Sequence, residues 1–215
     1  MSKKELFKKI IAYFSQSMPN PKTELHYSNP FQLLVAVILS AQCTDKRVNI
    51  VTPELYKKFP DYKEMAKANE NEIFELIKSC SFANNKSHNI LEMSKMLQKD
   101  YKGILPSDVD ELQKLPGVGR KTANVVASVI YNKPVLAVDT HVFRVAARIG
   151  LSTNAKNPLE TEQQLTKYFP AKVIANAHHW LILHGRYVCK ARKPHCKECG
   201  ISNLCSYNNN TNNSF

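Results

Sequence analysis

Amphipathic segments at helical spacing follow one another along nearly the whole chain, and this pattern constrains the fold more than any other feature. Leu6, Ile10 and Phe14 begin the series, and Pro19 ends that first segment. Further helices are expected over residues 30–39, 48–59, 70–79, 86–98, 109–115, 121–131, 159–168 and 171–184, with a short helix from Thr140. Alternating strand patterns are missing from the sequence, and residues 134–138 are too few to start a sheet. We therefore predict an all-α protein.

The charge of the chain indicates its partner. Lys and Arg number 30 against 18 Asp and Glu, which gives a net charge of +12. Such a surplus favours an anionic partner, most simply nucleic acid. Residues 163–197 contain seven basic side chains and no acidic one. The Asn-rich end, residues 208–215, is expected to be disordered.

Neither a membrane span nor an export signal is predicted. The longest apolar stretch, Phe31–Leu39, is far shorter than the roughly 20 residues that cross a bilayer. Met1–Glu5 leads into an amphipathic segment without an apolar core. We expect a cytoplasmic protein of bacterial type that associates with the nucleoid, with nuclear or organellar residence as the alternative.

Four of the six cysteines cluster near the end of the sequence. They are Cys189, Cys196, Cys199 and Cys205. In a reducing compartment, thiols at this density indicate a metal site before disulfides. Their uneven spacing, with a single C-x2-C, favours an iron–sulfur cluster over structural zinc, which stays the alternative. Cys43 and Cys80 are expected to be isolated buried core residues.

Basic residues surround these cysteines. The candidates for DNA contact are Arg186, Lys190, Arg192 and Lys193. A charge run of this kind is often only a solvated face. A metal cluster that holds the loop in one shape favours a surface that contacts phosphates instead.

A glycine-containing turn joins two helical segments at Leu115–Thr122. Gly117, Val118, Gly119 and Arg120 lie at its centre. Successive backbone N–H groups at the start of a helix suit a phosphate, because the positive end of the helix dipole points there. A simple helix-capping turn is the alternative, but Arg120, Lys121 and Lys133, without a nearby acid, favour a helix–hairpin–helix that binds DNA.

Lys121 and Asp139 are the two candidate catalytic residues. The helix dipole disfavours a cation at the start of a helix, so Lys121 would have increased nucleophilic amine character, although a phosphate contact is the simpler explanation. Asp139 is the sole carboxylate between Glu111 and Glu160. It is a helix N-cap, a functional acid, or both, because a capping carboxylate is stabilised as the anion and held in one orientation.

Taken together, these blocks resemble the endonuclease III family of helix–hairpin–helix DNA glycosylases. The matching segments are 39–42 (LSAQ), 115–124 (LPGVGRKTAN), 137–144 (AVDTHVFR), 178–186 (HHWLILHGR) and the four-cysteine loop. They occur in the family's order, and the resemblance covers residues 4–207.

The resemblance implies the fold and the cofactor. It implies a six-helix domain over residues 22–132, and an iron–sulfur domain made of residues 1–21 and 133–207. The four clustered cysteines would bind a [4Fe-4S] cluster that shapes the basic loop for DNA. The substrate would be double-stranded DNA with oxidised pyrimidines or abasic sites, bound by a monomer.

The resemblance also implies the reaction. Lys121 would attack C1′ of a flipped nucleotide, with Asp139 stabilising the positive charge on the sugar. The resulting Schiff base would allow β-elimination 3′ to the lesion. Because Lys121 is present, a bifunctional glycosylase and lyase is expected. The alternatives are a monofunctional glycosylase and a non-catalytic, structure-specific DNA-binding module.

Three more residues are assigned to DNA through the resemblance. Gln42 matches the residue that fills the gap left by the flipped nucleotide. Phe82 lies at the family's second wedge, where Cys80–Phe82 departs from the usual aliphatic–glycine–leucine pattern. This departure leaves the lesion range and opposite-base preference open. His141 lines the pocket or contacts phosphate, unless it is a core residue.

Overall fold

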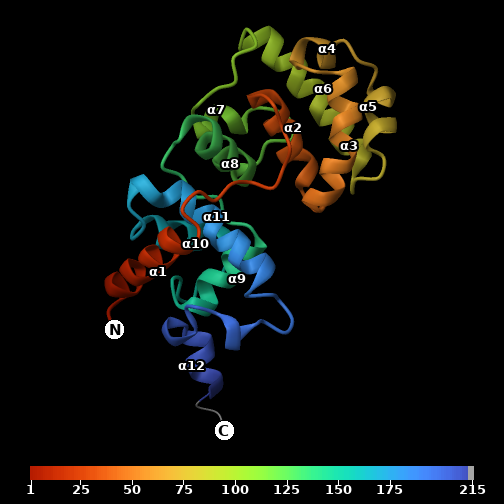
Figure 1. Ribbon diagram of the computed structural model, residues 1–215. Helices are drawn as coiled ribbons and strands as arrows, with labels where there is room; N and C mark the ends of the chain where they lie inside the picture. Colours follow the sequence, from red (N-terminus) through yellow and green to blue (C-terminus); the bar gives the residue numbers. More distant parts are fainter. Residues whose placement is uncertain (213–215) are drawn as a thin grey trace. The chain divides into compact units, whose positions relative to one another are not determined.

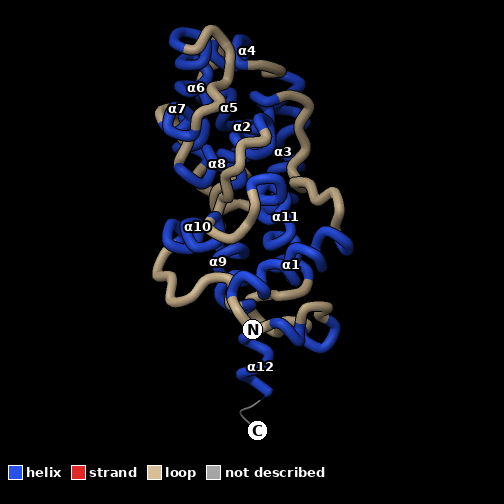
Figure 2. Tube along the Cα trace, turned by 90° about the vertical axis from the view of Figure 1, so that its left-hand side faces the viewer, coloured by secondary structure: helices blue, strands red, loops and turns tan. Residues whose placement is uncertain are grey.

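The computed structural model describes residues 1–212, and every regular element in that range is a helix (Figure 2). The chain divides into two compact units. Unit 1 contains residues 1–23 and 133–215, and unit 2 contains residues 24–132. Unit 2 begins two residues later than the six-helix domain expected from the sequence. Within residues 1–212, no helix is both long and apolar enough to cross a membrane.

Unit 2 contains seven helices, coloured orange to green in Figure 1. They are α2 (Pro30–Ser40), α3 (Asp45–Lys58), α4 (Tyr62–Ala66), α5 (Glu70–Ile77), α6 (Ala83–Asp100), α7 (Val109–Gln113) and α8 (Arg120–Tyr131). Helix α2 lies at the centre of the core of unit 2, because all residues from 31 to 39 are buried. Asn29 caps this helix by accepting the N–H of Gln32, and Pro30 occupies the first turn, where no N–H partner is required.

Helix α4 was not expected from the sequence. It is five residues long, which is too short to show a helical repeat. Asp61 starts it by accepting the N–H groups of Lys63 and Glu64, and the fully buried Met65 attaches it to the unit. The N-cap and one buried side chain therefore stabilise this helix, without a repeating apolar face.

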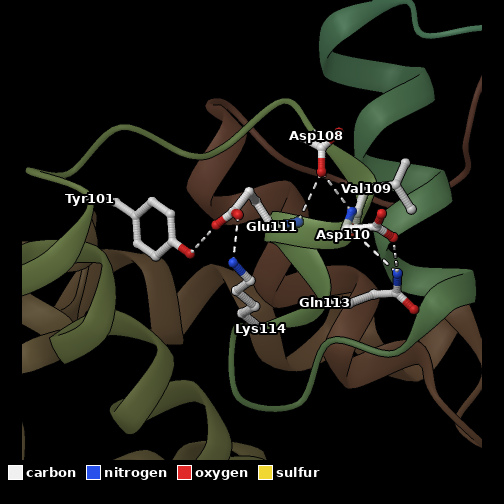
Figure 3. Close-up of polar contacts among 7 residues, drawn as sticks. All are labelled: Tyr101, Asp108, Val109, Asp110, Glu111, Gln113 and Lys114. Atoms are coloured by element: carbon white, nitrogen blue, oxygen red, sulfur yellow. Dashed lines mark hydrogen bonds and ion pairs between the residues drawn. The ribbon is translucent and has the colours of Figure 1, made fainter.

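Helix α7 precedes the hairpin and is held by side chains at both ends (Figure 3). Asp108 caps its start by accepting the N–H groups of Asp110 and Glu111. The carboxylate of Glu111 accepts from the Tyr101 hydroxyl at 3.1 Å and contacts Lys114 Nζ at 2.5 Å. These contacts fix the helix from which the hairpin leaves.

Unit 1 combines the N-terminal helix with the second half of the chain. Its elements are α1 (Lys3–Ser17), α9 (Thr140–Ile149), α10 (Pro158–Thr166), α11 (Ala171–Tyr187), the 3-10 turns η1 (Cys196–Glu198) and η2 (Ser202–Leu204), and α12 (Ser206–Asn212). Phe14 of α1 stacks on Trp180 of α11 with ring centres 5.8 Å apart. Trp180 Nε1 donates to the Met18 carbonyl at 2.7 Å, so the two ends of the unit share one core.

The expectation of disorder from residue 208 is wrong for residues 208–212, which belong to helix α12. Contacts with α9 hold the start of α12. Ser206 Oγ donates to the Ile149 carbonyl at 3.2 Å, and the Tyr207 ring lies 4.8 Å from the Arg148 guanidinium. Composition could not predict these contacts, because they depend on a partner 57 residues away. Residues 213–215 of the expected tail lie outside the described part of the chain.

Candidate functional site

The hairpin between α7 and α8 depends on glycine at one position. Gly117 has φ of +78°, and a Cβ there would lie 2.9 Å from Asn89 Cβ of α6. Both the backbone and the packing therefore exclude a side chain. Gly119 differs, because its φ is −85° and a Cβ would meet nothing within 4 Å. It is the N-cap of α8, and no side chain caps this helix.

Lys121 is the second residue of α8 and is exposed. Thr122, Ala123 and Asn124 are buried, so packing fixes the direction in which the first turn faces. Arg120 is exposed beside it. The hairpin therefore presents two basic side chains at the positive end of a helix dipole, an arrangement that suits an anion.

Val118 has a packing role in the hairpin. Its side chain is buried, and its N–H donates to the Leu115 carbonyl at 3.1 Å. Neither group faces solvent. The exposed positions of the hairpin are Gly117, Gly119 and Arg120.

Gln42 and Phe82 both have left-handed backbones, with φ of 53° and 57°. Both side chains are exposed, Phe82 by 61%. A left-handed conformation costs a non-glycine residue roughly 1–2 kcal/mol, and an exposed phenylalanine gains nothing from burial. Strained, exposed residues at helix junctions are candidates for function. Gln42 lies between α2 and α3, and Phe82 is the N-cap of α6.

Asp139 in unit 1 is the N-cap of α9. Its Oδ1 accepts the Val142 N–H at 2.8 Å, and the side chain is half-buried. The preceding residues Ala137 and Val138 are buried, and the Ala137 carbonyl lies 2.9 Å from His178 Nδ1. The capping bond holds the carboxylate in one orientation.

His141 participates in the packing of α9 on α11. Its Nδ1 lies 3.2 Å from Arg144 Nη2, which also donates to the carbonyls of Gly185 and Cys189 at 2.9 and 3.2 Å. A Cβ at Gly185 would lie 3.0 Å from His141 Cβ, so glycine permits the close helix approach. The structure gives His141 a structural contact, beside the DNA contact expected for it.

All four clustered cysteines line one small cavity in unit 1. They are Cys189, Cys196, Cys199 and Cys205. Burial raises the pKa of Cys196 and Cys199, and the neighbouring thiols add to the increase. A cationic group among the thiols would reverse that effect, because it stabilises thiolates. Within residues 1–212, no group of three or more Cys, His, Asp or Glu side chains is placed so that it could hold a single metal ion.

Two polar side chains contact sulfur atoms of these cysteines. Arg148 Nη1 donates to the Lys190 carbonyl at 2.7 Å and lies 3.5 Å from Cys189 Sγ, while Nη2 donates to the Ala191 carbonyl at 3.0 Å. His184 Nε2 lies 3.7 Å from Cys199 Sγ, and burial lowers the pKa of His184 to about 4. At neutral pH this ring is therefore uncharged.

The basic loop, residues 190–195, begins where Arg148 donates to the Lys190 carbonyl. Lys190, Arg192 and Lys193 are exposed, and Lys193 has a left-handed φ of 51°. Arg186 is half-buried at the end of α11. The loop thus combines a fixed start with three solvent-facing cations, as a phosphate-contacting surface requires.

The candidate residues are divided between the two units. Unit 2 carries Gln42, Phe82, Gly117, Val118, Gly119, Arg120 and Lys121. Unit 1 carries Asp139, His141, Arg186, Lys190, Arg192, Lys193 and the four clustered cysteines. Our sequence reasoning missed Arg144, Arg148 and His184. The four-residue spacing of the arginines on α9, which places both on one helical face, was the available signal.

The expectation for the two remaining cysteines needs correction. Cys80 is buried as expected, but Cys43 is only half-buried.

Comparisons with known proteins give a consistent result. The family model described as HhH-GPD superfamily base excision DNA repair protein matches residues 35–171, more than half of the chain. The endonuclease III of Rickettsia felis is 48% identical over 205 residues, which are 95% of this chain and 96% of that protein. The endonuclease III of Escherichia coli is 43% identical over 92% of this chain and 93% of that protein.

Solved structures of endonuclease III also resemble this chain. One described as a trapped endonuclease III–DNA covalent intermediate, an estranged-adenine complex, has a TM-score of 0.92 and 41% identity. The match covers 98% of this chain and 99% of that one. A non-covalent endonuclease III–DNA complex has a TM-score of 0.93 and 40% identity, with complete coverage of both chains.

Proposed function

Because this chain belongs to the HhH-GPD superfamily of base excision DNA repair proteins, and within it to the endonuclease III enzymes, we propose that it removes oxidised pyrimidines from duplex DNA and cleaves the abasic site that results. The observation that carries this proposal is Lys121, an exposed amine on the first turn of α8 behind the glycine hairpin. The local arrangement suits an amine nucleophile beside a phosphate-binding turn.

The base must leave the stack before the reaction, because duplex DNA hides C1′ and the glycosidic bond. Gln42 and Phe82 are suited to filling the vacated position, since both are exposed on strained turns of unit 2. Phe82 can also stack on a base. Gly119 and Arg120 bind a backbone phosphate and hold the duplex in register.

In the glycosylase step, the neutral amine of Lys121 attacks C1′. The N–C1′ bond forms as the C1′–base bond breaks, and the departing base acquires a proton. The capping bond orients the Asp139 carboxylate, which stabilises the positive charge that develops on the sugar. Opening of the sugar ring then gives a protonated imine on Lys121.

In the lyase step, the imine acidifies the C2′ proton. Loss of this proton expels the 3′ phosphate oxygen, and the strand breaks by β-elimination. Water then hydrolyses the imine, which releases the unsaturated sugar and restores the amine. One lysine therefore accounts for base release, the covalent intermediate and strand cleavage.

We propose that the four clustered cysteines bind a [4Fe-4S] cluster. Four thiols surround one cavity, and Arg148 and His184 provide polar groups within 3.5 and 3.7 Å of two sulfurs. Thiolates are the ligands that such clusters take, and hydrogen bonds to sulfur adjust their stability. The bound cluster would supply structural rigidity, and Arg148 would transmit this rigidity to the basic loop through the Lys190 and Ala191 carbonyls.

We also propose that the protein acts as a monomer on the bacterial nucleoid in the cytoplasm. The net charge of +12 supports association with DNA, and the relatives compared above are bacterial proteins. Abasic sites are expected to be substrates as well, because the lyase step begins from the same imine.

The test is borohydride trapping on a duplex that contains one oxidised pyrimidine or one abasic site. The native chain should form a covalent adduct, and Lys121→Gln should form none. Lys63→Gln is the matched control, because Lys63 is an exposed second residue of a helix in the same unit. Asp139→Asn should slow base release by at least about 100-fold, as expected for the loss of a charge-stabilising group.

Each other result selects a different function. Base release without an adduct would identify a monofunctional glycosylase. Binding without base release or strand cleavage, retained in Lys121→Arg, would identify a non-catalytic DNA-binding module.

A further inference from the structure

The turn between α2 and α3 is a type II β-turn over residues 40–43. The Cys43 N–H donates to the Ser40 carbonyl at 3.1 Å and closes the turn. Its second residue, Ala41, has φ of −59° and ψ of 115°, and its third, Gln42, has φ of 53°. Positive φ at the third position defines this turn type, and glycine or asparagine normally occupies it. A glutamine there is strained, because its Cβ disfavours the left-handed region.

A type I turn would relieve this strain. The two turn types share the hydrogen bond between their ends and differ by a rotation of the central peptide, here the one that joins Ala41 to Gln42. In type I the third residue has φ of about −90°, which most residue types adopt. The rotation reverses the direction of the Ala41 carbonyl. A group that binds this oxygen therefore decides which of the two turns forms.

A buried lysine binds that oxygen. Lys86 of α6 is only 6% exposed. Its Nζ donates to the Ala41 carbonyl at 2.7 Å and to the Leu39 carbonyl at 2.7 Å. The Leu39 oxygen is among the last four of α2, which have no partner inside the helix. A lysine removed from water must have its donors satisfied, so these two bonds stabilise Lys86 in its position.

Lys86 is also bonded to the turn that carries Phe82. Its backbone N–H donates to the Phe82 carbonyl at 3.1 Å, in the first turn of α6. One residue thus contacts both turns that carry an exposed, left-handed side chain. The bond to Phe82 uses the backbone, so only the turn of Gln42 depends on the lysine side chain.

We propose that Lys86 is a positioning residue that holds the 40–43 turn in its type II form and thereby directs the Gln42 side chain. Without its amino group, the Ala41–Gln42 peptide rotates, Gln42 leaves the left-handed region, and its side chain points in another direction. The effect on repair rests on the proposed function, in which Gln42 fills the gap left by the flipped nucleotide. The effect on the turn does not.

Nuclear Overhauser effects in the full-length protein measure the turn type. In a type II turn the Hα of the second residue lies close to the N–H of the third, whereas in a type I turn the two N–H groups lie close together. The native protein should show the contact between Ala41 Hα and the Gln42 N–H. Lys86→Met should replace it with a contact between the two N–H groups. Lys95→Met, which changes an exposed lysine of the same helix, should keep the native pattern.

A double-mutant cycle measures the effect on repair, through single-turnover base release from a duplex with one oxidised pyrimidine. Lys86→Met should slow release by about 10- to 100-fold, the loss that a misplacement of on the order of 1 Å can cause. Gln42→Ala should also slow release. Adding Lys86→Met to Gln42→Ala should cause no further loss, because Lys86 acts through Gln42. Lys95→Met should release base at the native rate.

A type II turn that persists in Lys86→Met would overturn the proposal and leave the lysine as a cap of α2. Losses that multiply in the double variant would overturn its action through Gln42. If Lys86→Met does not fold, Lys86→Gln undergoes the same measurements, because its side chain is one bond shorter and cannot contact both carbonyls. Failure of the native protein to release base would instead reject the proposed function, while the Overhauser effects would still decide the turn.

Discussion

Gly117 and Gly119 of the hairpin differ in backbone geometry and in surroundings. Gly117→Ala should lower the free energy of unfolding by about 1–3 kcal/mol, because alanine is strained at positive φ and its Cβ would press against Asn89. Chemical denaturation of the full-length protein, monitored by circular dichroism, measures the change.

Gly119→Ala is the matched control for this substitution. It should change stability by less than about 0.5 kcal/mol, because its φ is negative and its Cβ position is open. Equal losses in the two variants would contradict the packing that we describe for Gly117.

The left-handed backbones of Gln42 and Phe82 could not be predicted from the sequence, since these residue types do not predict positive φ.

At the scale of elements, helix α9 connects Asp139 at its start with the cysteine loop near its end. Arg148→Lys should accelerate loss of the visible absorbance of the proposed iron–sulfur cluster several-fold, because lysine cannot maintain all the guanidinium contacts with Cys189, Lys190 and Ala191. The measurement is the absorbance decay of the holoprotein in the presence of an iron chelator.

Arg192→Lys provides the control for that experiment. Arg192 is an exposed residue of the same loop, and the substitution keeps the charge. Its decay should match that of the native protein. If Arg148→Lys also decays at the native rate, the arginine does not hold the loop.

At the scale of the whole molecule, the surplus of positive charge should control affinity for DNA. Replacing Lys190, Arg192 and Lys193 together with glutamine should reduce the slope of log K against log salt by about 3, because each lost phosphate contact removes about 0.9. Fluorescence anisotropy with an undamaged duplex at several salt concentrations measures this slope.

A second triple variant separates local contact from net charge. Lys8, Lys57 and Lys99 are exposed lysines outside the basic loop, and their replacement by glutamine removes the same total charge. This variant should retain the native slope. Equal slopes in the two triple variants would show that overall charge, and not the loop, governs binding.

Helical periodicity made most of the secondary structure predictable. Long amphipathic segments such as α1 and α11 bury a repeating face, and this repeat is visible in the sequence. Helix α4 was missed because five residues are less than two turns. Helix α12 was missed because its contacts with Arg148 and Ile149 are tertiary, while its own composition favours disorder.

The sequence by itself determined the helical class, the glycine hairpin, the candidate pair Lys121 and Asp139, and the cysteine loop. These features depend on residue type and on spacing within short segments, where the chain itself sets the geometry. Only the tertiary structure decided which distant groups meet: the four thiols around one cavity, and Arg148 against the carbonyl groups of the basic loop. Such contacts follow from the packing of helices far apart in sequence, and local periodicity does not indicate them.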